Sequence, residues 1–182
     1  MKNNIFYSRG IAWAITAAVI ILSFLLGGGK SLGKLKTDAT DIFYNGVSGD
    51  GLGIQRELEH RVDYAYNMVT IANRYISGDK AVTQLTDARD ALINSNGIAQ
   101  KSTNNHKLTE AAAALYDRLG SEKLSDADAR LRESVNADLK ARNNIILNDG
   151  YNGRAREFNK ALGAFPASVI KTLGIVTELP LF

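Results

Sequence analysis

The chain has 182 residues, a formal net charge of +3 and 45% hydrophobic residues. This length accommodates one domain of about 130 residues, large enough to bury a core, together with an appendage. The absence of cysteine excludes disulfides and thiolate metal sites. Lys2 and Arg9 precede a hydrophobic segment, and subtracting them from the 22 basic residues leaves 20 against 19 acidic ones. Such a balanced remainder gives no electrostatic argument for binding nucleic acid.

The hydrophobic segment begins close to the N-terminus. Ile11 to Leu26 contains two polar residues and no charge, and with its flanking glycines it reaches about 20 residues, enough to cross a bilayer as a helix. Trp13 lies near one edge, where aromatic rings favour the membrane interface. We therefore expect a short tail at 1–10, a transmembrane anchor at 11–29 and the lipid bilayer as a partner, in a single-pass protein of the cell membrane.

A cleaved signal peptide is the competing interpretation of this segment. Lys2 and Arg9 would form its basic region and Ile11 to Leu26 its apolar region, although no Ala-x-Ala-like cleavage site follows. The side of the membrane is poorly determined. Three lysines follow the segment, which favours a cytoplasmic domain by one charge, and counting the terminal amine cancels that difference.

Residues 30–53 are predicted to be a glycine-rich linker. The Gly-Gly-Gly-Lys-Ser run at 27–31 resembles the end of a phosphate-binding loop, but the required earlier glycine is replaced by Phe24 inside the hydrophobic segment. That motif is rejected. The glycines at 49–53 are typical of a turn before the next helix.

The clearest soluble helix is predicted at 54–77. Its apolar residues advance by alternating steps of three and four: Leu58, Val62, Ala65, Val69, Ala72 and Ile76. A second stripe lies beside the first and consists of Tyr64, Met68, Ile71 and Tyr75. A helix that is apolar over most of its circumference is either wrapped by its own chain or buried against another chain. The second possibility predicts a homo-oligomer with this stripe at the contact.

The rest of the chain is predicted to fold as further helices. These cover 80–94, 107–119, a long stretch from the N-cap Ser125 to about Ala164, and 168–173, followed by an extended tail. Residues 98–106 could be a connector or a helical continuation. Pro166 ends the long helix. The fold class is therefore all-α, an antiparallel bundle of about four long helices at 54–182 with one N-terminal transmembrane helix.

Three asparagines lie on or beside apolar stripes: Asn67, Asn152 and Asn159. They either face solvent and cap turns, or form a buried polar layer that fixes the register between helices. Tyr151, Phe158 and Phe165 follow one another at intervals of seven and form an aromatic stripe along this edge. Arg61 and Asp63 are interpreted as surface charges.

Two groups of residues resemble the LemA family. Arg61, Asp63, Asn67 and Val69 match the family's Arg-x-Asp-Leu-Ile-Pro-Asn-Leu-Val in register, with Tyr66 in place of its proline. Tyr151-Asn152, Phe158-Asn159, Phe165-Pro166 and the closing Leu-Gly-Ile…Pro-Leu-Phe resemble the family's C-terminus. The resemblance covers residues 54–182. It implies a long-helix antiparallel bundle behind a membrane helix, and it implies little chemistry because the family's biochemical role is poorly defined.

Catalytic motifs are missing from the sequence. His60 and His106 are too few for a histidine-rich metal site, and there is no nucleophile elbow. We expect no catalytic residue, cofactor or metal. The favoured function is a membrane-anchored scaffold or protein-interaction module, self-associating or bound to another membrane protein. The alternative is a ligand- or stress-sensing domain that signals through its membrane helix.

Overall fold

The computed structural model describes residues 9–182, and this part of the chain folds entirely into α-helices, turns and an extended tail. The helices are α1 (Arg9–Asn45), α2 (Ile54–Ala72), α3 (Lys80–Ile93), α4 (Ile98–Gly120), α5 (Asp126–Asn148), α6 (Gly150–Gly163) and α7 (Ala167–Thr172). The predicted all-α bundle is confirmed. Helix α4 also shows that residues 98–106 are helical.

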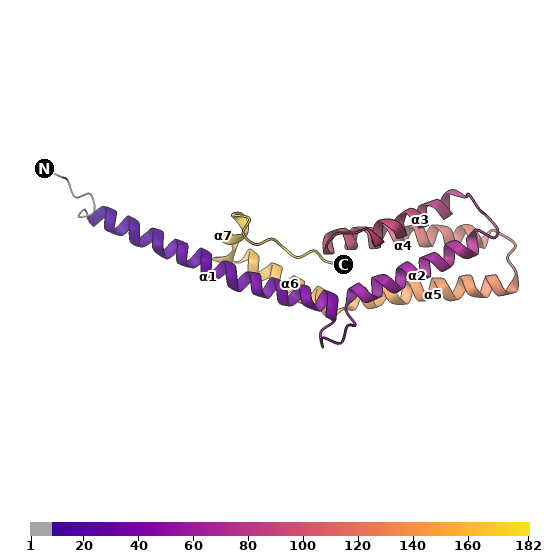
Figure 1. Cartoon of the computed structure of the whole chain (residues 1–182), viewed down its shortest axis with the longest axis horizontal. Helices are drawn as coiled ribbons and strands as arrows, with labels where there is room; N and C mark the ends of the chain where they lie inside the picture. Colours follow the sequence, from indigo (N-terminus) through magenta and orange to yellow (C-terminus); the bar gives the residue numbers. More distant parts are fainter. Residues whose placement is uncertain (1–8) are drawn as a thin grey trace.

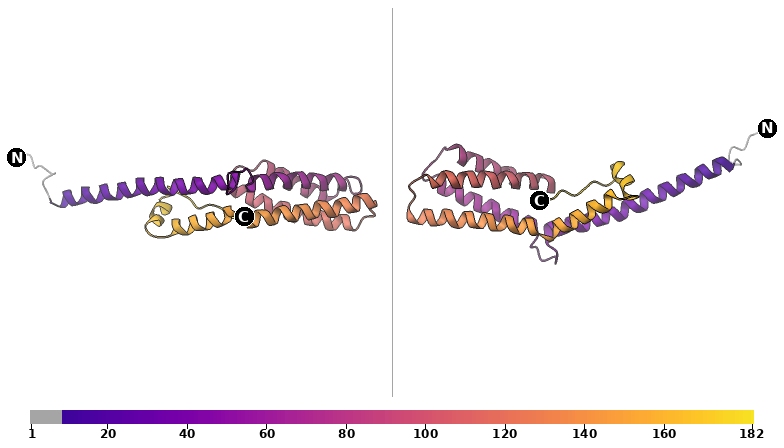
Figure 2. Two further views of the ribbon diagram at one scale, coloured as in Figure 1. Left: turned by 90° about the horizontal axis from the view of Figure 1, so that it is seen from below. Right: turned by 180° about the vertical axis from the view of Figure 1, so that it is seen from behind.

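The molecule is elongated and bent, with two arms that meet at a junction (Figure 1). One arm is a bundle in which α2 packs against α5 and α3 against α4. The other arm is α1, with α6 beside its second half and α7 beyond α6. The C-terminal tail runs back from α7 to the junction, as both views of Figure 2 show.

The long helix predicted from Ser125 to Ala164 is divided in two at Asp149. Ser125 caps α5 as predicted, and its side chain accepts a hydrogen bond from the Asp128 amide at 3.2 Å. Asp149 has an extended backbone (ψ 148°), and its carboxylate accepts from the Tyr151 amide at 2.7 Å. This aspartate therefore ends α5 and starts α6 in a new direction. The break lets α6 leave the bundle and pack on α1.

The predicted linker at 30–53 is wrong over most of its length, because α1 continues as a helix to Asn45. Its second half has partners that the local sequence does not reveal: Leu32, Ala39 and Phe43 are buried in the core. Packing therefore overrides the weak helix preference of glycine. The true turn is 46–53, where three glycines have positive φ values of 68–77° that favour glycine.

Candidate functional site at the membrane-proximal junction

The first half of α1 exposes apolar side chains around its whole circumference. An 18-residue window has a mean hydropathy of 2.2, and none of it is buried. Trp13 is 74% exposed and Leu26 is exposed as well, whereas Ile11 is half-buried. Among the described residues this is the one helix long and apolar enough to cross a membrane, and a signal sequence has the same length and composition. These residues are where the transmembrane segment was predicted.

The end of this apolar surface contacts α7. Phe24 and Leu25 pack against the buried core, and a Cβ atom added to Gly28 would lie 2.8 Å from Ile170 Cδ1. Glycine at position 28 therefore allows α1 and α7 to approach closely. Phe165 does not continue the predicted aromatic stripe. It follows the end of α6 and is 85% exposed.

Apolar side chains are also exposed on and after α7, namely Val169, Leu173 and Ile175. Together with Phe165 they form what we call the α7 apolar patch. It lies beside the end of the apolar part of α1, since Gly28 and Gly29 are the glycines that approach Ile170 and Ile175. The α7 apolar patch therefore adjoins the exposed apolar half of α1.

Two asparagines of α6 hold the C-terminal tail. Asn159 Nδ2 donates to the Leu179 carbonyl oxygen at 2.7 Å, and the Leu179 amide donates back to Asn159 Oδ1 at 2.8 Å. Asn152 Oδ1 accepts from the Phe182 amide at 3.0 Å, while its Nδ2 donates to two carbonyl oxygens at the end of α5. The expectation that these side chains set the register between helices is wrong for Asn159, whose side-chain hydrogen bonds go to the extended tail. The buried Asn152 bonds both to the tail and to the end of α5.

An aromatic cluster closes the junction. The ring of Phe43 lies 5.5 Å from that of Tyr151 and 5.6 Å from that of Phe182, measured between centroids. Tyr151 Oη donates to the Pro180 carbonyl oxygen at 2.7 Å, and burial raises the pKa of this phenol to about 12. Ser102 Oγ of α4 donates to the Leu181 carbonyl oxygen at 2.7 Å. The tail therefore ties α6, α1 and the bundle together. The buried Phe158 lies two turns after Tyr151 on α6.

Arg61 forms a polar layer inside the bundle, which corrects its interpretation as a surface charge. The residue is 1% exposed, whereas Asp63 is exposed. Its Nη1 donates to Asn105 and, at 2.7 Å, to Asn143 Oδ1, and its Nη2 donates to Thr109 Oγ1 at 2.8 Å. No carboxylate in residues 9–182 pairs with it, and burial lowers its pKa to about 10.

A sequence signal for this layer existed and was missed. Arg61 lies three residues after Leu58 and four before Ala65, so it shares their buried face. Asn67, the asparagine that was a candidate for a buried layer, is exposed. The asparagines that contact Arg61 come from α4 and α5 and carry the same signal. Asn105 precedes the buried Leu108 by three residues, and Asn143 lies four after Leu139 and three before Ile146.

The second stripe of α2 is covered by its own chain. Met68 and Ile71 are buried, and Tyr64 and Tyr75 are half-buried against the core. Tyr75 Oη donates to Asp128 Oδ2 at 2.6 Å across to α5. The prediction that this stripe forms the contact of a homo-oligomer is therefore wrong, since the remaining helices cover both stripes within one protomer.

The LemA family model matches residues 52–182, more than half of the chain. The chain belongs to the LemA family. No curated protein and no solved structure matches it. The matched region begins just before α2 and leaves out α1, and it contains Arg61, both tail-binding asparagines and the tail.

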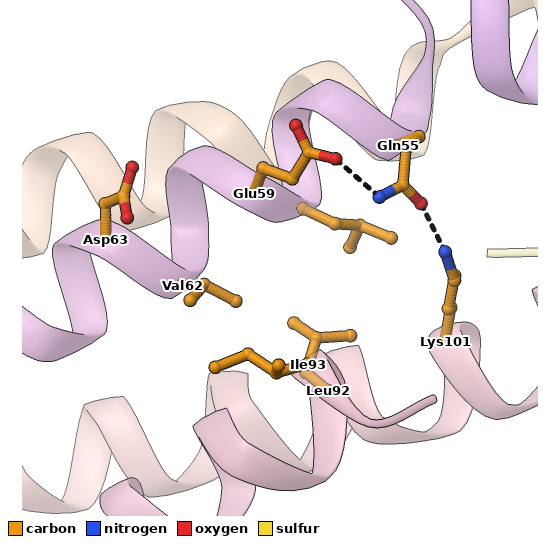
Figure 3. A pocket seen from close by; sticks show the side chains of 8 residues that line it. Gln55, Glu59, Val62, Asp63, Leu92, Ile93 and Lys101 are labelled. Atoms are coloured by element: carbon orange, nitrogen blue, oxygen red, sulfur yellow. Dashed lines mark hydrogen bonds between the residues drawn. The ribbon is translucent and has the colours of Figure 1, made fainter. Parts of the chain in front are cut away.

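An open pocket of about 300 Å³ lies in the LemA region between α2, the end of α3 and the start of α4 (Figure 3). Its apolar lining consists of Leu58, Val62, Leu92 and Ile93, and its polar side chains are Gln55, Glu59, Asp63 and Lys101. Lys101 donates to Gln55, whose amide donates to Glu59 at 2.7 Å. Burial lowers the pKa of Lys101. An apolar lining with a few polar side chains is typical of a small-molecule site.

Metal ligation is not provided for in the part of the chain that the structure describes. Within residues 9–182 no group of three or more His, Asp or Glu side chains is arranged to hold a metal ion.

Proposed function

We propose that this LemA-family protein is a single-pass, membrane-anchored helical scaffold, an interaction module without catalytic activity of its own. One observation carries the proposal. Helix α1 runs without a break from its exposed apolar half into a half that packs against α6 and α7. A helix that crosses the bilayer would then pass its orientation directly to the junction, and a flexible linker could not do so.

The same observation favours a retained anchor over a cleaved signal peptide. Cleavage near Gly27 to Gly29 would cut α1 within a helix and remove Phe24 and Leu25, which pack against the core. The contact between Gly28 and Ile170 would be lost with them. These contacts stabilise the arm only if the hydrophobic segment stays attached.

The α7 apolar patch supports the lipid bilayer as a partner. An exposed apolar patch on a domain marks an interaction surface, and this one adjoins the end of the span. Phenylalanine and leucine side chains beside a membrane helix partition favourably into the boundary between head groups and acyl chains. We propose that Phe165, Val169 and Leu173 lie in that boundary.

The chain lacks cysteine, so a thiol-specific label reacts only at a cysteine that is introduced by substitution. Nitroxide labels at Val169→Cys and Leu173→Cys, in full-length protein in lipid nanodiscs, should collide more with oxygen than with a water-soluble nickel chelate. A label at Tyr66→Cys, an exposed aromatic position on α2 of the bundle, serves as the matched control. Equal accessibility at all three positions would contradict the placement. N-terminal sequencing of protein from cell membranes tests the anchor, and a mature chain that starts near Lys30 would end the proposal.

Orientation is tested with the same cysteine variants. We propose the cytoplasmic side for the bundle, on the one-lysine difference across the span. A membrane-impermeant thiol reagent should then leave Tyr66→Cys unlabelled in intact cells and label it after lysis. Labelling of intact cells would place the bundle outside.

Self-association, or binding to another membrane protein, is part of the proposal, with a different contact from the α2 stripe. The apolar side chains of Leu131 and Ile145 are exposed on α5, two heptads apart. Mass measurement of the full chain in detergent should show an oligomer, and Leu131→Glu with Ile145→Glu should shift it to monomer. Tyr66→Glu, at an exposed aromatic residue of α2, is the control. A monomeric wild-type chain would remove self-association from the proposal.

A ligand-sensing domain is the second candidate. It requires a polar concave site between helices, and the cavity beside Arg61 is the observation that favours it. Binding of a small ligand there, together with a change in the arm, would support sensing over scaffolding alone.

A further inference from the structure

A small cavity of about 110 Å³ opens beside Arg61 between α2, α4 and α5. Its polar lining residues are Arg61, Thr109, Lys140 and three asparagines, Asn136, Asn143 and Asn144. The Lys140 ammonium also lies 5.8 Å from the centroid of the Tyr116 ring. No carboxylate lines it. Both charged groups at this cavity are therefore positive, and Lys140 is the exposed one.

Arg61 has hydrogen-bonding capacity left over. A guanidinium carries five N–H donors, and Arg61 uses three of them, two on Nη1 and one on Nη2. Its Nε is buried without a partner. Nε and Nη2 share the edge of the guanidinium that binds a carboxylate or phosphate through two parallel bonds. The unpartnered Nε thus lies on the edge suited to an oxyanion.

A buried charge with only neutral partners is costly, and proteins normally pair such a group. The nearest acidic residue on the same face of α2 is Glu57, one turn earlier, and it is bound by Arg142 at 3.1 Å. Glu57 is therefore engaged elsewhere. The other acidic residues near this part of α2, Glu59 and Asp63, are exposed and line the pocket on the α3 side.

We propose that the cavity beside Arg61 binds a small oxyanion, of the size of phosphate or acetate, whose charge pairs with the Arg61 guanidinium and the Lys140 ammonium. The cavity has room for several water molecules, so a small ion fits and a nucleotide does not. The three asparagine amides supply neutral donors that orient the ion. This binding site is independent of the membrane anchor and of any contact between chains.

The test uses full-length protein in detergent micelles at constant ionic strength, with sodium chloride exchanged for sodium phosphate or sodium acetate. Thermal unfolding followed by circular dichroism should show a midpoint that rises with the logarithm of the oxyanion concentration, because the ion binds the folded state alone. The resonance of the Arg61 Nε–H group should shift in the same titration. Phosphate and acetate in separate arms show which of the two oxyanions is preferred.

Two variants locate the effect. Lys140→Gln should weaken oxyanion binding about tenfold, while Lys107→Gln, at an exposed lysine of α4 away from the cavity, should leave it unchanged. Asn143→Asp places a carboxylate next to Arg61 Nη1, where the amide oxygen already accepts at 2.7 Å. That variant should unfold at a higher temperature than wild type in chloride and should no longer respond to phosphate.

The proposal is overturned if phosphate and acetate shift the midpoint no more than chloride does. It is also overturned if Asn143→Asp keeps the full phosphate response, because the response would then come from another site. Membrane retention and labelling results do not enter this test, so its failure leaves the proposed scaffold intact.

Discussion

The tail-binding asparagines allow a nearly isosteric perturbation of the junction, Asn159→Asp. The amide nitrogen that donates to the Leu179 carbonyl oxygen at 2.7 Å is replaced by a second carboxylate oxygen. The bond from the Leu179 amide to Oδ1, at 2.8 Å, can remain. One favourable contact therefore becomes a contact between two acceptors with almost no change in shape.

The expected cost follows from the two changes. Loss of the hydrogen bond costs about 1 kcal/mol, and a partly buried acceptor facing another acceptor adds about 2 kcal/mol. A total of about 3 kcal/mol corresponds to roughly a hundredfold change in the ratio of docked to undocked tail. The bundle is held by its own core, so we expect the tail to detach while the bundle stays folded.

Hydrogen exchange of the Leu179 and Phe182 amides measures this directly, because both are bonded to α6 asparagines. Their exchange should accelerate by about a hundredfold in Asn159→Asp, with little change in the core of α2. Acidification protonates the new carboxyl group, which can then donate to the Leu179 oxygen, so the acceleration should shrink at low pH.

The matched control is Asn148→Asp. Asn148 is exposed and donates at 2.8 Å to a carbonyl oxygen of its own helix, so the same chemical change occurs without contact to the tail. If Asn159→Asp and Asn148→Asp leave the two tail amides equally protected, the asparagine clamp does not hold the tail.

Three further outcomes follow from the structure. The Tyr75 hydroxyl is the main group that holds the pKa of Asp128 below its usual range. The Asp128 carboxylate therefore stabilises the fold at pH values above its pKa in the unfolded chain. That stability is lost as the pH falls through its lower pKa in the folded protein. In Tyr75→Phe that loss should be smaller and should be complete at a higher pH, as urea unfolding between pH 2 and 6 would show; an unchanged profile contradicts the assignment. Met68→Ala should destabilise the domain by about 2–5 kcal/mol without changing its oligomeric mass, whereas Tyr66→Ala should be nearly neutral in chemical denaturation. Gly28→Val should separate α7 from α1 and raise proteolysis after α6, and intact α7 contacts would show that close approach at this glycine is unnecessary.

Local signals in the sequence determined the type and ends of several elements. The uncharged run from Ile11 to Leu26 identified a helix suited to a membrane, since only composition and length matter there. Ser125 marked the start of α5, because a cap depends on residues three apart in the chain. The alternating steps of three and four on α2 identified its buried face. The LemA resemblance at both ends of the domain named the family.

Tertiary structure alone decided how these elements are used. Residues 30–45 have a local sequence typical of a linker, and they are helical because Leu32, Ala39 and Phe43 find partners from distant parts of the chain. Met68 and Ile71 could have packed against a second protomer or against the other helices of their own chain. The spacing of apolar residues along α2 is the same in both cases. Asn152 and Asn159 lie beside an apolar stripe whether they face another helix or a returning tail. The partner of a side chain depends on which segments pack together. The free energy of the whole folded chain decides that packing, and the spacing of residues along a single helix does not.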